Sequence, residues 1–195
     1  MEAAEHAAWL RLTLTPEIGP RTARTLLAAF GLPQAIFAAG REALSRHVPQ
    51  PLAATLSGAV AAEVAGAVRA AERWLALDEA HALVTLADAD YPPLLLATAD
   101  PPPLLFAAGR RELLQRPALA IVGSRSATQQ GVANAEAFAQ HLARAGLTIA
   151  SGLALGIDAA AHRGALKALD DGADASTIAV LGTGVDVVYP ASNRA

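Results

Sequence analysis

Cysteine is absent from this sequence, lysine occurs once, and aromatic residues make up only 4% of the chain. Without cysteine the protein has no disulfides, no thiolate chemistry and no cysteine-ligated zinc, which is typical of cytoplasmic proteins. The sequence also lacks an uncharged apolar run of about 18 residues, the length that a membrane helix needs. Its first residues are acidic where a signal peptide is basic. We therefore expect a soluble, cytoplasmic protein without a membrane span.

Charge is sparse as well. Charged residues make up 17% of the 195 residues, and the formal net charge is -3. This balance excludes a globally basic nucleic-acid-binding protein and leaves a local cationic patch open. Arginine supplies nearly all of the positive charge, and its planar guanidinium binds phosphate through two parallel hydrogen bonds. Hydrophobic residues reach 53%, which is enough for a core, although alanine provides much of it.

The pattern of apolar residues changes near residue 81. Before it, the spacing is helical and predicts helices over 3–14, 21–30 and 59–80. After it, short apolar runs alternate with helical stretches and predict strands over 82–86, 104–106, 118–122, 147–150 and 177–181. We therefore predict a small all-helical domain over 1–81 and an α/β domain over 82–195.

Strands that alternate with helices favour a Rossmann-like parallel sheet. Such a doubly wound sheet usually has about five or six strands. This sequence offers three after residue 118, with one or two more in the segment before it. We expect the sheet to be truncated at its C-terminal end, and the chain to be a fragment or a truncated product of a larger protein.

Glycine-containing loops follow the strands predicted after residue 118. The first loop contains Gly123, Ser124 and Arg125, and a second loop over 151–158 carries two further glycines. Loops of this type lie at the carboxyl edge of a parallel sheet and present backbone N–H groups to anions. Glycine lets a ligand approach the backbone, while Ser124 and Arg125 supply a hydroxyl and a forked cation. We predict a phosphate-binding site built from several loops, although an ordinary strand-to-helix turn would use the same residues.

Asp158 and His162 lie four residues apart, and thus on one face of the helix predicted after the second loop. They allow two interpretations: a base with its orienting partner in an enzyme, or a capping carboxylate beside a buried histidine. We favour the second, because no further histidine, cysteine or carboxylate completes a metal or catalytic set. The glycines also miss the spacing of the dinucleotide fingerprint, and no P-loop pattern occurs. We expect no enzyme activity, no cofactor and no metal.

Residues 16–19 separate the first two predicted helices. Ile18 and Gly19 resemble the loop of a helix-hairpin-helix motif. The exposed amides of such a loop contact DNA phosphates without reading the bases. A plain helical turn explains the same residues, since few cations lie nearby in the sequence. Both interpretations stay open.

Several motifs follow one another in a fixed order: Asp90-Tyr91-Pro92, residues 102–106, 121–125 and 151–154, Gly156-Ile157-Asp158, Ala161-His162, residues 177–182 and Tyr189-Pro190. In this order they resemble the DNA-processing protein A family (DprA/Smf), closely over about 82–195 and loosely over the helical region. The resemblance implies a sterile-alpha-motif-like (SAM-like) helical domain followed by an extended Rossmann domain. It also implies a protein without enzyme activity that binds and protects single-stranded DNA. Such a protein loads the RecA recombinase during natural transformation.

The resemblance also implies which residues contact DNA. Arg125 is the first candidate, and the pocket around it would be completed by Gly123, Ser124, Ser151, Gly152 and Gly156. Lys167 and Arg194 would extend the cationic track. The acidic connection over 169–176 is longer than the family's usual one, so we expect it to lie away from the DNA.

Two further expectations concern assembly and the alternative function. The family's dimerisation surface makes a homodimer the expectation for the whole protein. The alternative function is a Rossmann-like nucleotide hydrolase of the phosphoribohydrolase type. The Pro-Gly-Gly-x-Gly-Thr block of those enzymes does not occur in this sequence.

Overall fold

The computed structural model describes residues 3–174, 176–184, 187 and 190. Its contacts divide the chain into two compact units, Met1–Gly109 and Arg110–Ala195, and each is described by itself. The boundary predicted near residue 81 falls inside the first unit, where helices give way to strands. That the two domains divide near residue 81 therefore stays a prediction.

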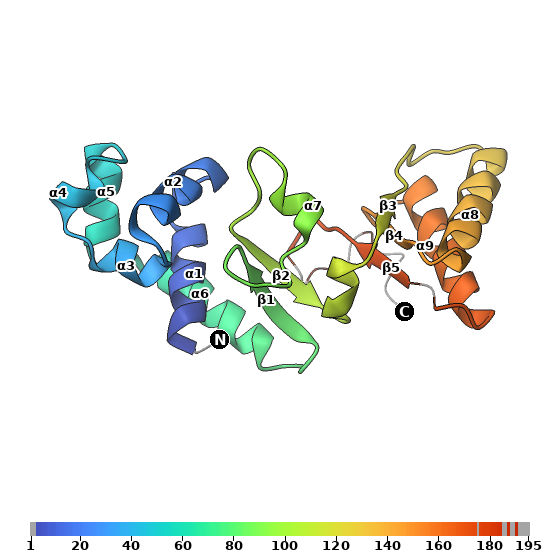
Figure 1. Ribbon diagram of the computed structural model, residues 1–195, viewed down its shortest axis with the longest axis horizontal. Helices are drawn as coiled ribbons and strands as arrows, with labels where there is room; N and C mark the ends of the chain where they lie inside the picture. Colours follow the sequence, from blue (N-terminus) through green and yellow to red (C-terminus); the bar gives the residue numbers. More distant parts are fainter. Residues whose placement is uncertain (1–2, 175, 185–186, 188–189, 191–195) are drawn as a thin grey trace. The chain divides into compact units, whose positions relative to one another are not determined.

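The first unit begins with a series of helices: α1 (Ala3–Leu14), α2 (Pro20–Phe30), α3 (Pro33–Ala38), α4 (Arg41–Leu44), α5 (Gln50–Ser57) and α6 (Ala62–Leu75) (Figure 1). Proline stands in the first turn of α2, α3 and α5, where the helix needs no backbone N–H. The helices predicted over 3–14 and 21–30 match α1 and α2 closely. The third is shorter than the predicted 59–80, because α6 begins at Ala62 and ends at Leu75.

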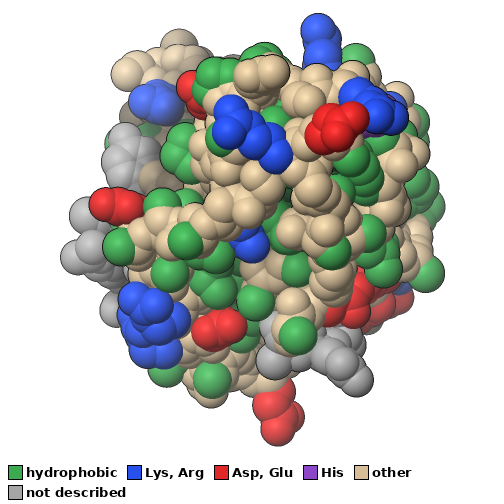
Figure 2. All heavy atoms as spheres, turned by 90° about the vertical axis from the view of Figure 1, so that its left-hand side faces the viewer, with side chains coloured by type: hydrophobic (Ala, Val, Ile, Leu, Met, Phe, Trp, Pro, Cys, Tyr) green, Lys and Arg blue, Asp and Glu red, His purple; other side chains and the backbone are tan. Residues whose placement is uncertain are grey.

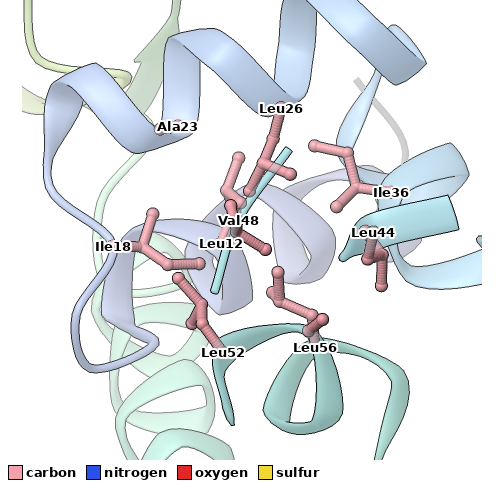
Figure 3. Packing of buried hydrophobic residues seen from close by; sticks show 10 residues of the cluster. Leu12, Ile18, Ala23, Leu26, Ile36, Leu44, Val48, Leu52 and Leu56 are labelled. Carbon is pink, nitrogen blue, oxygen red and sulfur yellow. The ribbon is translucent and has the colours of Figure 1, made fainter. Parts of the chain in front are cut away.

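Leucine and isoleucine side chains from the first helices meet in one core (Figure 3). Leu12, Leu26, Ile36 and Leu44 come from α1 to α4 and are each 0% exposed. Burial of each such side chain contributes about 1.5–3 kcal/mol. Ile18, from the turn between α1 and α2, reaches the same core and thereby fixes the turn to the helices.

A two-stranded sheet completes the first unit. Strands β1 (His81–Thr85) and β2 (Leu104–Ala108) pair antiparallel, with the short helix α7 (Pro93–Leu96) between them. Within the described residues this pair forms its own sheet and adds no strand to the parallel sheet, so our expectation of one or two extra strands there is wrong. The reason is packing: Leu83 and Leu104 share a core with Trp9 and Ala71 of the helices.

The second unit contains the alternating elements predicted from the sequence. After a 3-10 helix (Arg111–Gln115) come β3 (Ala118–Ala120), α8 (Gln129–Arg144), β4 (Thr148–Ser151), α9 (Ile157–Asp170) and β5 (Ser176–Ala179). The strands form a parallel sheet in the order β3-β4-β5, in which Leu119, Ile149 and Thr177 are aligned across the strands. The Rossmann-like strand–helix alternation is confirmed. It places the carboxyl ends of the three strands at one edge of the sheet.

Helices α8 and α9 pack tightly side by side (Figure 1). Their interface consists of small residues, including Ala139 and Ala143 from α8 and Ala161 and Ala165 from α9. Gly164 marks the closest approach, since a Cβ at this position would lie 2.2 Å from the Glu136 carbonyl oxygen. Both helices also contact β4. The core of this unit therefore forms through close approach of the helix backbones rather than through large side chains.

Within the described part of the chain, no individual helix has the length and apolar character needed to cross a membrane. The bent pair of α5 and α6 meets that requirement jointly, by length and composition only.

Candidate nucleic-acid interface

The loop between β3 and α8 presents the Gly-Ser-Arg sequence on the surface. Gly123, Ser124 and Arg125 are exposed, and Arg125 forms no ion pair or side-chain hydrogen bond with any residue that the structure describes. Among the same residues, the backbone amides of Ser124 and Arg125 have no acceptor. Thr128 caps α8 directly afterwards, because its Oγ1 accepts from the Gly131 amide at 3.1 Å. An unpaired guanidinium beside free amides at a helix N-terminus is suited to binding an anion.

The loop between β4 and α9 contacts this first loop through its backbone. Gly156 has a φ of 78°, and a Cβ there would lie 2.2 Å from the Ser124 carbonyl oxygen, so only glycine fits. The Ile157 amide donates to the same oxygen at 3.2 Å. A Cβ on Gly123 would lie 2.7 Å from Cγ1 of Ile157. These glycines therefore allow the two loops to approach each other. From the sequence we predicted instead that they allow a ligand to approach the backbone.

Asp158, the second residue of α9, joins the two loops through a carboxylate that is only 6% exposed. Its Oδ1 accepts from the Gly123 amide at 3.3 Å, and its Oδ2 accepts from the Ala154 amide at 3.4 Å. A Cβ on Gly152 would lie 2.9 Å from Oδ2, so this glycine makes room for the carboxylate. The negative charge also lies beside the positive end of the α9 dipole. The capping bond expected of Asp158 is not formed among the described residues, because its oxygens accept from amides of the two loops and the start of α9 has no side-chain cap.

His162 lies one turn further along α9 and is also 6% exposed. Its Nδ1 lies 2.7 Å from Thr177 Oγ1, and that hydroxyl donates to the Ile149 carbonyl oxygen at 2.7 Å. Nδ1 must therefore donate, and Nε2 is left without a partner among the described residues. Burial lowers the pKa of His162 below its ordinary value of 6.5, against the opposing effect of the Asp158 carboxylate. His162 is a buried histidine that links α9 to the sheet.

Ser151 and Gly152 stand at the end of β4. Ser151 is 3% exposed, and its Oγ donates to the Ile121 carbonyl oxygen at 2.6 Å. The hydroxyl hydrogen thus holds β4 to the segment after β3 and is not available to an outside oxygen. Gly152 is exposed at the rim of the second loop. A DNA contact by either residue stays a prediction.

Lys167 lies away from the two loops. It follows Ile157 by ten residues in α9, which places it roughly 15 Å along the helix axis. Its ammonium pairs with Glu136 of α8 and lowers the pKa of that carboxyl, and Arg163 pairs with Glu136 at 3.2 Å. The structure therefore does not bring Lys167 together with the other predicted site residues. Arg194 lies outside the described residues.

The acidic connection after α9 is held by cations of its own unit. Asp171 pairs with Arg144, and Gln140 donates to the same carboxylate at 2.9 Å. Asp174 pairs with Arg116. Since Asp171 follows the last residue of α9, this cluster lies at the opposite end of that helix from the two loops.

Comparison with known proteins identifies the family. A model described as DNA recombination-mediator protein A matches residues 82–195, which include both loops. The chain belongs to this family. A second model, described as a DprA-like N-terminal HHH domain, matches residues 3–66, so the family's helix-hairpin-helix domain precedes the α/β domain.

Individual members of the DNA recombination-mediator family are similar over parts of their length. DNA processing protein DprA of Streptococcus pneumoniae is 40% identical over 131 residues, which are 63% of this chain and 44% of that protein. Protein Smf of Synechocystis is 42% identical over 115 residues, or 57% of this chain and 28% of that protein. The X-ray structure of the S. pneumoniae protein superposes with a TM-score of 0.62 and 31% identity, over 95% of this chain and 60% of that one. In the sequence alignments the chain matches less than half the length of these curated relatives, and in the structural superposition it covers 60% of the S. pneumoniae chain.

The turn between α1 and α2 lies within the residues that match the family's HHH domain. Glu17 has a φ of 69°, and the Ile18 amide donates to the Thr15 carbonyl oxygen at 3.2 Å. The nearest cation on α2, Arg21, pairs with Asp100 at 3.3 Å. On the face of the molecule that carries α4 and α5, cationic side chains are scattered and form no continuous track (Figure 2). A DNA-contacting hairpin and a plain helical turn therefore both stay open for these residues.

The role of Asp158 could be predicted from the sequence only in part. Its position one residue into a helix indicated a cap, but its hydrogen bonds go to amides of two loops, one of them 35 residues away. Glycines at 123 and 152 were the available signal, because each leaves room for a side chain of the α9 first turn. No group of three or more metal-ligating side chains occurs in the described ranges.

Proposed function

We propose that this member of the DNA recombination-mediator family binds single-stranded DNA through the phosphate groups, with the Gly-Ser-Arg loop as its main contact. The observation that carries the proposal is Arg125, an exposed guanidinium without a partner among the described residues. In a chain of net charge -3, most other cations of the second unit are already paired with carboxylates. A phosphate is the ligand that an unpaired arginine beside free amides fits best.

The two loops supply the rigidity that such a contact needs. Hydrogen bonds from Ile157 to Ser124 and from Gly123 to Asp158 fix the backbone on which Arg125 stands. A guanidinium held by a fixed backbone loses less conformational entropy when it binds a phosphate. Because phosphates are common to all sequences, we expect little base preference.

Replacing Arg125 by alanine tests this proposal. We expect the Arg125→Ala variant to bind a fluorescent oligo-dT more weakly, because one cation that neutralises a phosphate is lost. The slope of log K against log salt should also become shallower by about 0.7, the value for one phosphate on a single strand. Fluorescence anisotropy at several salt concentrations measures both effects.

Arg144→Ala is the matched control. It removes the same charge from the same unit, but it lies at the last residue of α8 and already pairs with Asp171. Its affinity and salt slope should match those of the unmodified chain. Equal losses in both variants would contradict a site on the Gly-Ser-Arg loop, and a salt-independent affinity would contradict phosphate binding altogether.

For the whole protein we propose the wider role that the family resemblance implies. It acts in the cytoplasm as a dimer, protects incoming single strands, and loads RecA on them without catalysing a reaction itself. The support is family membership over residues 82–195 and the exposed Arg125, which has no partner among the described residues. RecA filament assembly on strands coated with a single-strand-binding protein, with and without the whole protein, measures this role. Unchanged assembly would contradict it.

A further inference from the structure

Asp158 places a buried carboxylate in the first turn of α9. Helix N-termini bind anions because their free N–H groups and the helix dipole favour negative charge. Here the Ile157 amide donates to the Ser124 carbonyl oxygen, and the negative charge beside the helix end is that of Asp158. The helix dipole therefore has a negative charge of the protein itself in its first turn.

We infer that Asp158 is a positioning residue for single-stranded DNA, which holds the Gly-Ser-Arg loop in its binding conformation without contacting the strand. The inference rests on the function proposed above and extends it to a residue buried behind the loop. Asp158 is 6% exposed, and its two oxygens hold the amides of Gly123 and Ala154. Gly123 is two residues before Arg125, so this hydrogen bond sets the backbone from which the guanidinium projects.

The sign of the effect of Asp158→Asn separates positioning from simple electrostatics. If Asp158 acted only as a negative charge near the strand, its neutralisation would strengthen binding, because repulsion of phosphates would be removed. If it positions the loop, binding weakens although the protein becomes more positive. An asparagine cannot accept both hydrogen bonds, since its NH2 group would face an amide N–H. We expect about tenfold weaker binding of oligo-dT, the order of one charge-assisted hydrogen bond.

Asp170→Asn is the matched control. It removes one carboxylate from the last residue of the same helix, roughly 18 Å along the axis from Asp158. Its affinity should be unchanged or slightly higher. A Gly152→Ala variant displaces the carboxylate without changing charge, since its Cβ would lie 2.9 Å from Oδ2. It should weaken binding in the same direction as Asp158→Asn, and unchanged binding would overturn the inference.

A double variant shows whether Asp158 acts through Arg125. We expect Arg125→Ala combined with Asp158→Asn to bind no more weakly than Arg125→Ala alone, because the position of a missing guanidinium has no effect. Additive losses would mean that Asp158 supports the fold in general, which would overturn the positioning role. Circular dichroism and urea titration identify a variant that has lost its fold. If Asp158→Asn has lost its fold, the milder Gly152→Ala replaces it in the double variant with Arg125→Ala.

Hydrogen exchange gives a measurement that does not depend on DNA. In the Asp158→Asn variant the amides of Gly123 and Ala154 should exchange faster, while amides in the middle of α8 should not change. Unchanged exchange at Gly123 and Ala154 would overturn the loop-joining role even if DNA affinity fell. Faster exchange in a chain whose unmodified form binds no oligo-dT would instead contradict the proposed function and leave the role of Asp158 purely structural.

Discussion

At the scale of single residues, His162 makes the stability of the second unit depend on pH. Its ring is buried, its Nδ1 donates to Thr177, and its Nε2 has no partner among the described residues. Because burial lowers the pKa of His162 in the folded state, the unfolded chain takes up a proton at a higher pH than the folded chain. The contribution of this residue is fully present above pH 6.5 and decreases as the pH falls below it.

We therefore expect the free energy of unfolding to decrease between pH 7.5 and pH 5.5, by at most about 1.4 kcal/mol for each pH unit below 6.5. The variant His162→Gln keeps a donor for Thr177 but does not titrate, so its dependence over this interval should be weaker. Urea denaturation at both pH values provides the comparison. Identical pH dependence in the two proteins would show that another group is responsible.

At the scale of helices, Gly164 sets how closely α8 and α9 can pack. Its Cβ would lie 2.2 Å from a carbonyl oxygen of α8 and 2.9 Å from the Ala139 Cβ. The backbone cannot move away without separating the helices, so the gain in helix propensity from Gly164→Ala is outweighed. We expect a loss of about 2 kcal/mol in the free energy of unfolding, the usual cost of overpacking. Urea denaturation measures it.

Gly66 in α6 provides the opposite case. A Cβ at this position would meet only the end of the Arg69 side chain, at 3.9 Å. Gly66→Ala should therefore raise the stability of its unit by about 1 kcal/mol, through helix propensity alone. A similar gain in Gly164→Ala would contradict the close helix contact that the structure describes.

The strand–loop–helix order of the second unit was predictable because each strand is an apolar run that ends in glycine. The role of those glycines was not predictable, since Gly123 and Gly156 meet groups that lie more than 30 residues away or on another loop. The placement of β1 and β2 in a separate sheet could not be predicted from the sequence either. The apolar residues of the two strands do not indicate which sheet they join, and the separate sheet depends on contacts of Leu83 and Leu104 with the helical core around Trp9.

The same limit applies to the cations of the candidate site. Arg125 and Lys167 are both positive residues of the second unit and were both predicted to contact DNA. Only the fold distinguishes them, because α9 carries Lys167 to Glu136 and leaves Arg125 unpaired among the described residues. The helical boundaries of α1 and α2 followed from local signals, since proline and glycine mark them directly.

At the scale of the whole molecule, the division between the two compact units can be tested by proteolysis. Gly109, Arg110 and Arg111 are exposed and lie where one unit ends and the next begins. Exposed segments between compact units are preferred cleavage sites. Limited trypsin digestion followed by mass spectrometry should therefore yield a lasting fragment that ends at Arg110 or Arg111.

If the domains instead divide near residue 81, as predicted from the sequence, trypsin should produce a different pattern of fragments. Trypsin would then degrade the segment of β1 and β2 quickly, and a fragment that ends at Arg73, the last arginine before that boundary, would accumulate. Such a product would contradict the packing of Leu83 and Leu104 against Trp9. Persistence of the longer fragment would place the strand pair with the helical domain.

The contact between the two loops also constrains how the sequence can change during evolution. Gly123 faces the side chain of Ile157, so a larger residue at 123 is compatible with a smaller one at 157, and these positions should covary among homologues. Gly152 faces the Asp158 carboxylate, which the hydrogen bonds to Gly123 and Ala154 retain, so this pair is not free to exchange. Gly156 faces the backbone oxygen of Ser124, which no substitution can remove, so no partner mutation compensates for its loss. Of the three glycines, Gly123 is thus open to paired exchange, while Gly156 is fixed by the chain itself.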